Sequence, residues 1–159
     1  MKLKLFNTRE GADALDGKFY ERGIREFSPL NKSIVRIYSC GPTVYNYAHI
    51  GNLSSYIYAD ILRRSVKLAG EEFAKTANYA VWKVEHVMNL TDVDDKTIRD
   101  SAREFPELNP MDALHALTEK YSRIFLNEML EIGNDVSAIL FTKATDNIAE
   151  IQDLIKKLL

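Results

Sequence analysis

The sequence predicts an α/β fold that begins with a parallel sheet and continues into C-terminal helices. Three observations predict it: a β-branched and aromatic segment at Ser33–Tyr38, helical apolar spacing from Asn52, and a second strand-like segment at Tyr79–Leu90. Strand, helix and strand in this order form a right-handed βαβ unit with parallel strands, and ligands bind at the carboxyl ends of such strands. We therefore expect residues 40–52 and 89–96 to lie side by side at one edge of the sheet, here called the rim.

The elements up to the first helix follow from local patterns. Leu3–Asn7 predicts a short edge strand, and residues 8–32, which contain several glycines, predict hairpins or loops. Ser33–Tyr38 predicts a buried strand. The helix from Asn52 is expected to end at Gly70. Its expected apolar face consists of Leu53, Ile57, Ile61, Leu62 and Val66.

Two more helices are predicted in the last third of the chain. Asn109 and Pro110 are typical of a helix cap and first helical residue, and Gly133 follows the expected end. The last helix is expected to begin at Thr145-Asp146. The apolar residues at helical spacing are Leu114, Leu117, Tyr121, Ile124 and Phe125 in the first of these helices, and Ile148, Ile151, Leu154, Ile155 and Leu158 in the second.

Composition and charge exclude several classes of protein. The chain has 159 residues, of which 46% are hydrophobic and 28% charged, as in an ordinary globular domain. A net charge of −2 gives no support to a sequence-independent nucleic-acid binder, although an acidic enzyme can still contact RNA through one small basic face. Cys40 is the single cysteine, which excludes an internal disulfide framework and a complete cysteine-rich metal site within this chain.

Hydropathy predicts a cytoplasmic protein without membrane association. The N-terminus lacks an apolar run long enough for a signal peptide. Residues 37–59 contain no Asp, Glu, Lys or Arg, but Gly41, Pro42, Asn46 and His49 interrupt the segment. These groups favour a buried or cleft-lining segment over a membrane span.

The first segment of the rim has features of a nucleotide site. Residues 40–52 leave a strand, form a loop and enter a helix, whose first backbone N–H groups we expect to point outward unpaired and to attract phosphate. His49 and Asn52 are candidate donors to phosphate oxygens that gain charge in a transition state. A capped helix with a structural histidine is the alternative.

The second segment of the rim, residues 89–96, brings Asp92, Asp94 and Asp95 to the start of a helix. Such carboxylates either cap the helix or bind Mg²⁺, and the loop lacks the pattern of an EF-hand. Cys40 has three interpretations: a small buried side chain, a nucleophile paired with His49, or one ligand of a zinc ion.

Together these segments resemble cysteinyl-tRNA synthetases. Residues 38–52 (YSCGPTVYNYAHIGN) are similar to the family signature Cys-Gly-x-Thr-Val-Tyr…His-Ile-Gly-His/Asn, and residues 89–96 (NLTDVDDK) resemble its Asn-Ile-Thr-Asp-x-Asp-Asp-Lys block. The opening LKLFNT at 3–8 is similar too, and KATDNI at 143–148 echoes a later Arg-Ala-Thr-x-x-Ile block. Residues 9–32 and 71–83 look like variable insertions, and their roles are open.

The resemblance implies the first half of a Rossmann-like class I synthetase catalytic domain over residues 1–159, with a connective helical region starting near residue 110. It implies ATP-dependent activation of cysteine, with Mg²⁺ and zinc as metals, and attachment of cysteine to tRNA by a protein that is a monomer. The resemblance implies a role for each matching residue. Cys40 would be a zinc ligand, and Gly41, Thr43 and Thr91 would line the cysteine pocket. His49, Gly51 and Asn52 would bind ATP, with His49 and Asn52 as the catalytic residues, and the rim would be stabilised by Asp92, Asp94, Asp95 and Lys96.

The sequence departs from the family in several places. Asn46 stands where the family often has Asp, and Leu53-Ser54 replaces a frequent Ala-Arg. The family is much longer, and its remaining zinc ligands, second signature loop and anticodon-binding domain are absent here. We expect this chain to be a truncated part that is inactive alone, binds zinc poorly and self-associates through its open sheet edge.

Three alternatives stay open. His86 and His115 are candidate substitutes for the missing zinc ligands, although nothing in the sequence places either near Cys40. A related ligase that joins cysteine to an amino-sugar would share the same signature. A non-catalytic nucleotide-binding or interaction paralogue is the third alternative.

Overall fold

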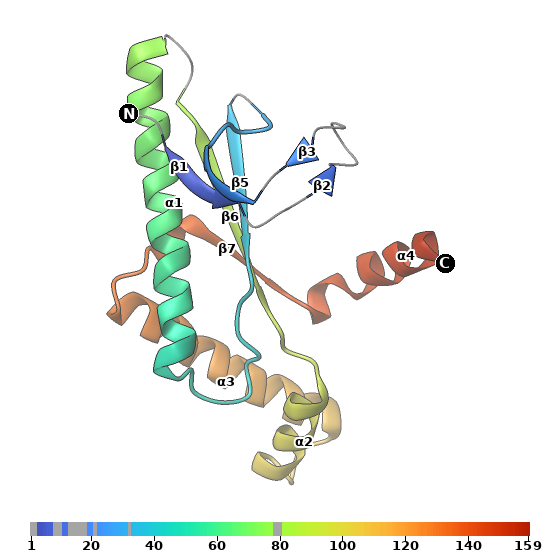
Figure 1. Ribbon diagram of the computed structural model, residues 1–159. Helices are drawn as coiled ribbons and strands as arrows, with labels where there is room; N and C mark the ends of the chain where they lie inside the picture. The colour runs from blue at the N-terminus through green and yellow to red at the C-terminus, as the bar shows by residue number, and fades with distance from the viewer. Residues whose placement is uncertain (1–2, 8–10, 13–18, 21, 32, 78–80) are drawn as a thin grey trace. The chain divides into compact units, whose positions relative to one another are not determined.

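The computed structural model describes residues 3–7, 11–12, 19–20, 22–31, 33–77 and 81–159 (Figure 1). The chain forms two compact units, one from Met1–Val35 and Arg64–Val84, the other from Arg36–Arg63 and Glu85–Leu159. The first unit holds the N-terminal strands, and the second holds the rim. Helix α1 (Ile50–Ala77) contributes its first half to the second unit and its second half to the first.

The N-terminal strands form two antiparallel pairs. β1 (Lys4–Asn7) pairs with β4 (Gly23–Glu26), with Lys4 opposite Glu26, and β2 (Gly11–Ala12) pairs with β3 (Phe19–Tyr20). The predicted edge strand at the start of the chain is therefore confirmed, as is hairpin character between residues 8 and 32. Residues 8–10, 13–18, 21 and 32 of that prediction lie outside the described residues.

Gly70 does not end the helix, so that prediction is wrong: α1 continues to Ala77. A Cβ atom at Gly70 would lie 2.9 Å from the Cβ of Trp82. Trp82 is buried and packs against Phe27 and Phe73, with ring centroids 5.8 Å away in both cases. Position 70 therefore requires glycine because the helix backbone packs closely against the indole, and not because the helix stops there.

A three-stranded parallel sheet carries the second unit (Figure 1). Its order is β5 (Ile34–Ser39), β6 (Lys83–Leu90) and β7 (Ile139–Lys143). β6 and β7 pair in parallel, with His86 opposite Ile139 and Leu90 opposite Lys143. The predicted βαβ unit is confirmed as β5–α1–β6, while β7 was not predicted and the second strand begins at Lys83.

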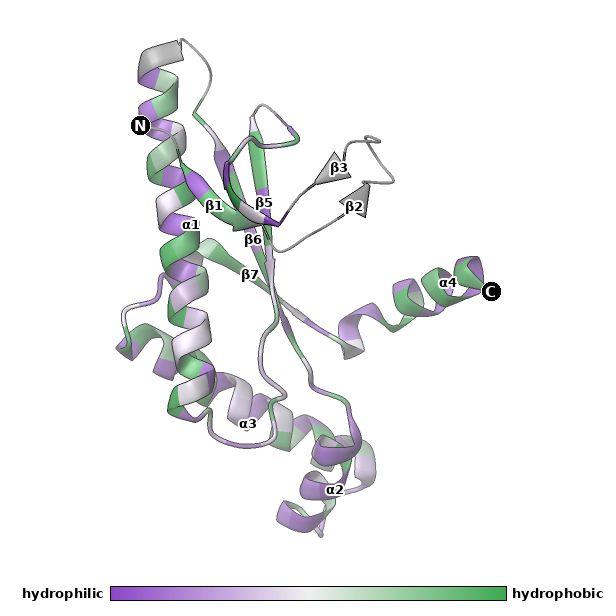
Figure 2. Ribbon diagram, viewed as in Figure 1, coloured by the Kyte–Doolittle hydropathy of each residue, from purple (hydrophilic) through white to green (hydrophobic). Residues whose placement is uncertain are grey.

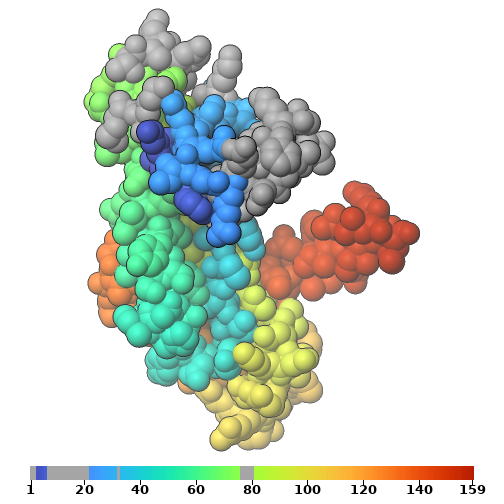
Figure 3. Space-filling view, viewed as in Figure 1, coloured from blue at the N-terminus to red at the C-terminus, as the bar shows by residue number. Residues whose placement is uncertain are grey.

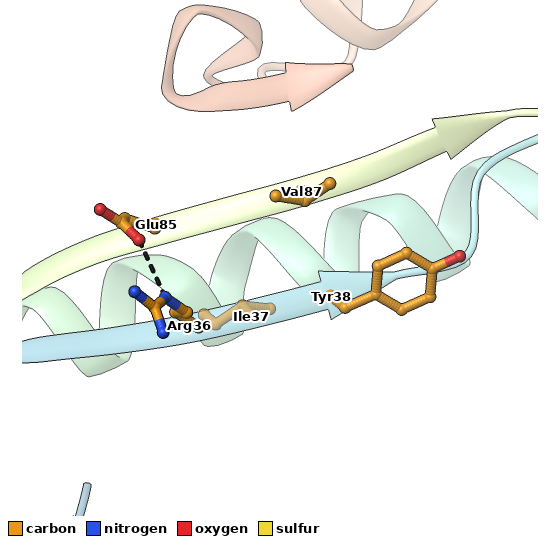
Figure 4. Close-up of a pocket in the computed structure, with 5 residues that line it drawn as sticks. All are labelled: Arg36, Ile37, Tyr38, Glu85 and Val87. Atoms are coloured by element: carbon orange, nitrogen blue, oxygen red, sulfur yellow. Dashed lines mark hydrogen bonds and ion pairs between the residues drawn. The ribbon is translucent and has the colours of Figure 1, made fainter. Parts of the chain in front are cut away.

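The prediction that the first strand is buried holds only for Val35. Arg36 and Tyr38 are exposed, the latter by 70%. Figure 4 shows these two side chains together with Ile37, Glu85 and Val87 on β5 and β6. The five residues line a hollow of about 360 Å³. Arg36 Nε donates to Glu85 Oε2 at 3.2 Å, so this face presents a solvated ion pair rather than a core layer.

Three helices follow the second strand: α2 (Asp95–Glu104), α3 (Pro110–Glu131) and α4 (Ile148–Leu158). α3 begins as predicted, because Asn109 Oδ1 accepts a hydrogen bond from the Asp112 N–H at 3.0 Å. α4 begins later than predicted, because residues Thr145–Asn147 form a 3-10 turn. The buried core of the unit consists of Val44, Tyr56, Met88, Leu90, Leu117, Tyr121, Phe125, Met129 and Ile139.

The predicted apolar face of α1 is buried only in part: Val66 is 2% exposed, but other positions of that face are not buried. Ile61 and Leu62 are 53% and 37% exposed, whereas Asp60 and Arg63 are buried at 4% and 5%. Arg63 donates to Asp60 Oδ1 through Nη2 at 2.7 Å and Nε at 3.0 Å, and to Asp135 Oδ2 at 3.2 Å. The buried charges are tolerated because they hydrogen-bond each other.

Candidate active site

Hydrogen bonds join the two rim segments, which confirms that they lie side by side. The N–H of Val44 donates to the carbonyl of Thr91 at 3.0 Å, and the N–H of Thr91 donates to the carbonyl of Pro42 at 2.9 Å. Thr43 and Thr91 form a parallel bridge that extends the pairing of β5 and β6 past the strand ends. The predicted cysteine-pocket residues Gly41, Thr43 and Thr91 therefore lie together.

Asn89 holds this junction through its side chain. Its Oδ1 accepts hydrogen bonds from the Gly41 N–H at 3.1 Å and the Tyr38 hydroxyl at 2.9 Å, and its Nδ2 donates to Thr91 Oγ1 at 3.1 Å. A Cβ atom on Gly41 would lie 1.8 Å from the carbonyl oxygen of Asn89. Glycine is needed at position 41 because the two backbones are so close. Two sequence signals pointed to Asn89 without giving its role: it is a polar residue at the carboxyl end of a strand, and it opens the NLTDVDDK segment.

Cys40 is exposed, so its interpretation as a small buried side chain is wrong. Its Sγ donates to the carbonyl of Gly41 at 3.5 Å, and the His49 ring instead bonds to the Gly51 backbone. The thiol therefore lies at the surface of the rim, next to Gly41, whose N–H is held by Asn89. An accessible thiol beside an anchored backbone can supply one ligand of a zinc ion.

His49 occupies the start of α1, where the sequence predicted unpaired N–H groups. The Gly51 N–H donates to His49 Nδ1 at 3.1 Å, and the N–H groups of Asn52 and Leu53 donate to the His49 carbonyl at 2.9 and 3.1 Å. That expectation is corrected: the histidine itself caps this turn. Because Nδ1 accepts a hydrogen bond, the neutral ring carries its proton on Nε2. The side chains of His49 and Asn52 are both exposed.

The carboxylates after β6 have separate tasks. Asp94 caps α2, because its Oδ1 accepts from the N–H groups of Lys96 and Thr97 at 2.9 and 2.8 Å. Asp92 is buried and accepts from the N–H and hydroxyl of Thr145 at 3.1 and 2.5 Å. The capping interpretation is therefore confirmed for Asp94. Asp92 instead links the rim to the segment before α4. This contact joins residues far apart in the sequence, so no local pattern predicted it.

His86 and His115, the candidate zinc ligands, belong to no group of potential metal ligands among the described residues. Within the described ranges, no group of three or more His, Cys, Asp and Glu side chains is arranged to hold a metal ion. His115 is exposed on α3. His86 lies on β6 as predicted, 2% exposed, with Nε2 2.7 Å from Ser39 Oγ and Nδ1 without a hydrogen-bond partner among the described residues.

Burial sets the protonation of two groups beneath the rim. The pKa of His86 is lowered by burial and by the positive charge of Arg63, against a smaller opposing effect of Asp60. Burial, with a contribution from Cys40, raises the pKa of Tyr56 to about 12. Both side chains are therefore neutral at pH 7.

A parallel βαβ unit with a polar, glycine-containing loop at the carboxyl end of a strand is the kind of site at which α/β domains bind ligands. A sequence model of the family described as tRNA synthetases class I (C) catalytic domain matches residues 26–159. The chain belongs to this family, which confirms the resemblance, the α/β fold with a parallel sheet, and the C-terminal helices.

The similar proteins are named Cysteine–tRNA ligase. The one from Koribacter versatilis is 40% identical over 158 residues, which is 99% of this chain and 26% of that protein. Those from Brachyspira hyodysenteriae and Protochlamydia amoebophila are 41% and 36% identical over 88% and 99% of this chain. The chain spans about a quarter of the length of these relatives. None of the helices in the described residues is long and apolar enough to span a membrane.

Proposed function

We propose that the complete protein containing this chain activates cysteine with ATP and attaches it to tRNA. The observation that carries this proposal is the rim itself: an exposed thiol, Cys40, and the helix-capping His49 lie on one loop that is hydrogen-bonded to Thr91. The family of the chain and the names of its relatives support the same reaction.

Cysteine would bind at the junction of Gly41, Thr43 and Thr91. The missing side chain at Gly41 lets this loop lie directly against β6, and the hydrogen bond to Asn89 fixes the loop where it would border the amino acid. Cys40 would supply one thiolate to a zinc ion whose other ligands are not grouped with it in the described residues. When bound, zinc supplies a soft Lewis acid that prefers a thiolate to the hydroxyl of serine.

ATP would bind where the loop enters α1. The cysteine carboxylate attacks the α-phosphorus, a P–O bond forms, and the bond to pyrophosphate breaks. Mg²⁺, when bound with ATP, would supply positive charge to the leaving phosphates. The N–H groups of Gly51, Asn52 and Leu53 already bond to His49, so we assign the donors to side chains. The Nε2–H of His49 and the amide of Asn52 would donate to the α-phosphate oxygens as these gain charge. A ribose hydroxyl of tRNA then attacks the acyl carbonyl and AMP leaves.

ATP–pyrophosphate exchange on the complete protein tests the amino-acid site. We expect exchange with cysteine far above that with serine, and loss of most cysteine exchange in Cys40→Ser. Ser33→Ala, at an exposed serine just before β5, is the matched control and should exchange normally. Normal cysteine exchange in Cys40→Ser would disprove the zinc role of this thiol. Charging assays with tRNA and with an amino-sugar then identify the acceptor.

The same assay tests His49. His49→Ala should lower kcat by about 10²–10³, the usual cost of removing one donor to a developing oxyanion. The KM for ATP should change much less, because the donor acts mainly in the transition state. His115→Ala, at an exposed position on α3, should leave both constants unchanged. A raised KM for ATP with a normal kcat would contradict this role and indicate ground-state binding only.

A further inference from the structure

The carboxyl end of β7 reaches the same edge of the sheet as the two rim segments, because the strands are parallel. The pairing of β6 and β7 runs up to Lys143, which lies opposite Leu90. One more bond continues it, since the N–H of Ala144 donates to the carbonyl of Leu90 at 3.2 Å. The turn Thr145–Asn147 therefore begins beside the residues that leave β6.

Asp92 joins these two strand ends through its side chain. The carboxylate is 4% exposed. Its Oδ1 accepts a hydrogen bond from the N–H of Thr145 at 3.1 Å, and its Oδ2 accepts one from the Thr145 hydroxyl at 2.5 Å. A buried carboxylate is costly unless donors satisfy it, so we expect the folded protein to keep both bonds. Two bonds to one residue fix both the distance and the direction between the ends of β6 and β7.

Thr91 lies directly before Asp92 and is held from the opposite side. Its N–H donates to the carbonyl of Pro42 at 2.9 Å, and its carbonyl accepts from the N–H of Val44 at 3.0 Å. These bonds attach Thr91 to the loop after β5. The bonds between Asp92 and Thr145 attach the same stretch of backbone to the end of β7. Thr91 is therefore fixed between two neighbours.

The end of β7 is itself anchored. The ammonium of Lys143 forms an ion pair with Glu119 on α3. The side-chain amide of Asn147 donates to the carbonyl of Lys143 at 2.7 Å, which closes the turn around Thr145. A side chain can position its partner only when its own attachment point is fixed. Helix α3 and this turn supply that fixed point for Asp92.

We propose that Asp92 and Thr145 are a positioning pair for the amino-acid site, which hold Thr91 where it would border cysteine and do not touch the substrate themselves. A group that orients a binding residue matters because a small displacement of that residue weakens binding steeply. The inference rests on the proposed function, in which Thr91 borders the amino acid. It adds a contact between residues 53 positions apart in the sequence.

ATP–pyrophosphate exchange on the complete protein, with cysteine and ATP varied in turn, tests this pair. Asp92→Ala removes both bonds and should raise the KM for cysteine about tenfold or more. The KM for ATP should stay unchanged, because ATP would bind at the start of α1. Asp92→Asn should keep most of the affinity, since its amide oxygen can accept from the Thr145 N–H while its nitrogen donates to the hydroxyl oxygen.

Substitutions of Thr145 test the other half of the pair. Thr145→Ser keeps the hydroxyl and should behave like the wild type. Thr145→Val keeps the backbone bond alone and should raise the KM for cysteine by less than Asp92→Ala does. The double variant Asp92→Ala/Thr145→Val should be no worse than Asp92→Ala, because both substitutions act on the same contact. Thr145→Val also replaces Asp92→Ala in the test if circular dichroism shows that Asp92→Ala does not fold.

A general loss of folded protein gives a different result from a displaced Thr91. It lowers the apparent kcat and leaves both KM values unchanged, because a KM does not depend on the amount of active enzyme. Asn109→Ala is the matched control, since it removes the cap of α3 and so costs stability without touching the rim. Its KM for cysteine should equal that of the wild type.

Three results overturn the inference: an unchanged KM for cysteine in the folded variants, an equal rise in the KM for ATP, or additive effects in the double variant. Any of these with normal exchange by the wild type rejects the positioning pair alone and leaves the proposed function intact. Absence of cysteine-dependent exchange in the wild type rejects the proposed function, and the positioning pair with it.

Discussion

Helices α3 and α4 have the same kind of sequence pattern but opposite environments. Both carry apolar residues at helical spacing, yet Leu117, Phe125 and Met129 of α3 are 0%, 3% and 0% exposed. On α4, Leu154 and Leu158 are 58% and 78% exposed. Figure 2 shows the apolar stripe of α4, and Figure 3 shows its side chains at the surface.

The difference between these helices shows what periodicity encodes. A 3.6-residue apolar spacing predicts that a helix forms with one apolar face, and it does not tell which other segment covers that face. α3 is covered because β6 and α1 bring Met88 and Tyr56 into the same core. The described residues supply no such layer for α4. The energetic value of a leucine therefore depends on the helix that carries it.

The largest expected effect comes from truncating the buried leucine. Leu117→Ala should lower the free energy of unfolding by about 2–5 kcal/mol, because it removes a fully buried side chain and leaves a cavity. Leu154→Ala is the matched control on α4 and should change stability by no more than about 0.5 kcal/mol. Urea unfolding of the chain measures both. Equal losses would contradict the exposure of α4.

A smaller loss of stability is expected at Gly41, where the loop backbone lies closest to the backbone of Asn89. Gly41→Ala should destabilise the chain by about 1–3 kcal/mol, because the added Cβ overlaps the Asn89 carbonyl and two backbones must separate. Gly51→Ala is the control, since its Cβ would meet only the ring of His49 at 3.0 Å, and that ring can move. A melting temperature for Gly41→Ala equal to that of the control would show that the rim yields easily.

Much of the fold and of the rim could be predicted because the signals are local. The cap at Asn109 and the strand–helix–strand order each depend on residues within one or two elements. The parallel order then brought residues 40–52 and 89–96 together without knowledge of any distance. The carboxylates before α2 are a second local pattern, and the helix cap that they predicted is confirmed at Asp94.

The remaining features depend on partners far away in the sequence. Gly70 resembled a helix end, but its neighbour Trp82 explains it. The buried face of α1 includes Arg63, because Asp60 and Asp135 satisfy its charge, and no hydrophobic scale anticipates that choice. His49 capping its own helix is a rotamer choice that residue type alone leaves open.

Removing the Asn89 side chain is expected to lower the free energy of unfolding by less than Gly41→Ala does, because only side-chain hydrogen bonds are lost. Asn89→Ala deletes the bonds to Gly41, Tyr38 and Thr91 and should cost about 1–2 kcal/mol, mainly because the Gly41 N–H is left unsatisfied. Tyr38→Phe removes one exposed bond and should cost less. In the complete protein, Asn89→Ala should raise the KM for cysteine. A normal KM in this variant would separate the junction from substrate binding.

The smallest expected effect is a pH dependence of the free energy of unfolding that comes from His86. The pKa of His86 is below 6.5 in the folded chain, because burial and Arg63 oppose its charge, and it returns to about 6.5 on unfolding. Below that value the unfolded chain binds a proton that the folded chain does not, so the stabilisation is complete above pH 6.5 and is lost as pH falls. Unfolding free energies between pH 7.5 and 5.5 should therefore decrease toward acid. His86→Gln should flatten this slope, and His115→Gln, at an exposed site, should keep it. A slope that persists unchanged in His86→Gln would assign the titration to another group.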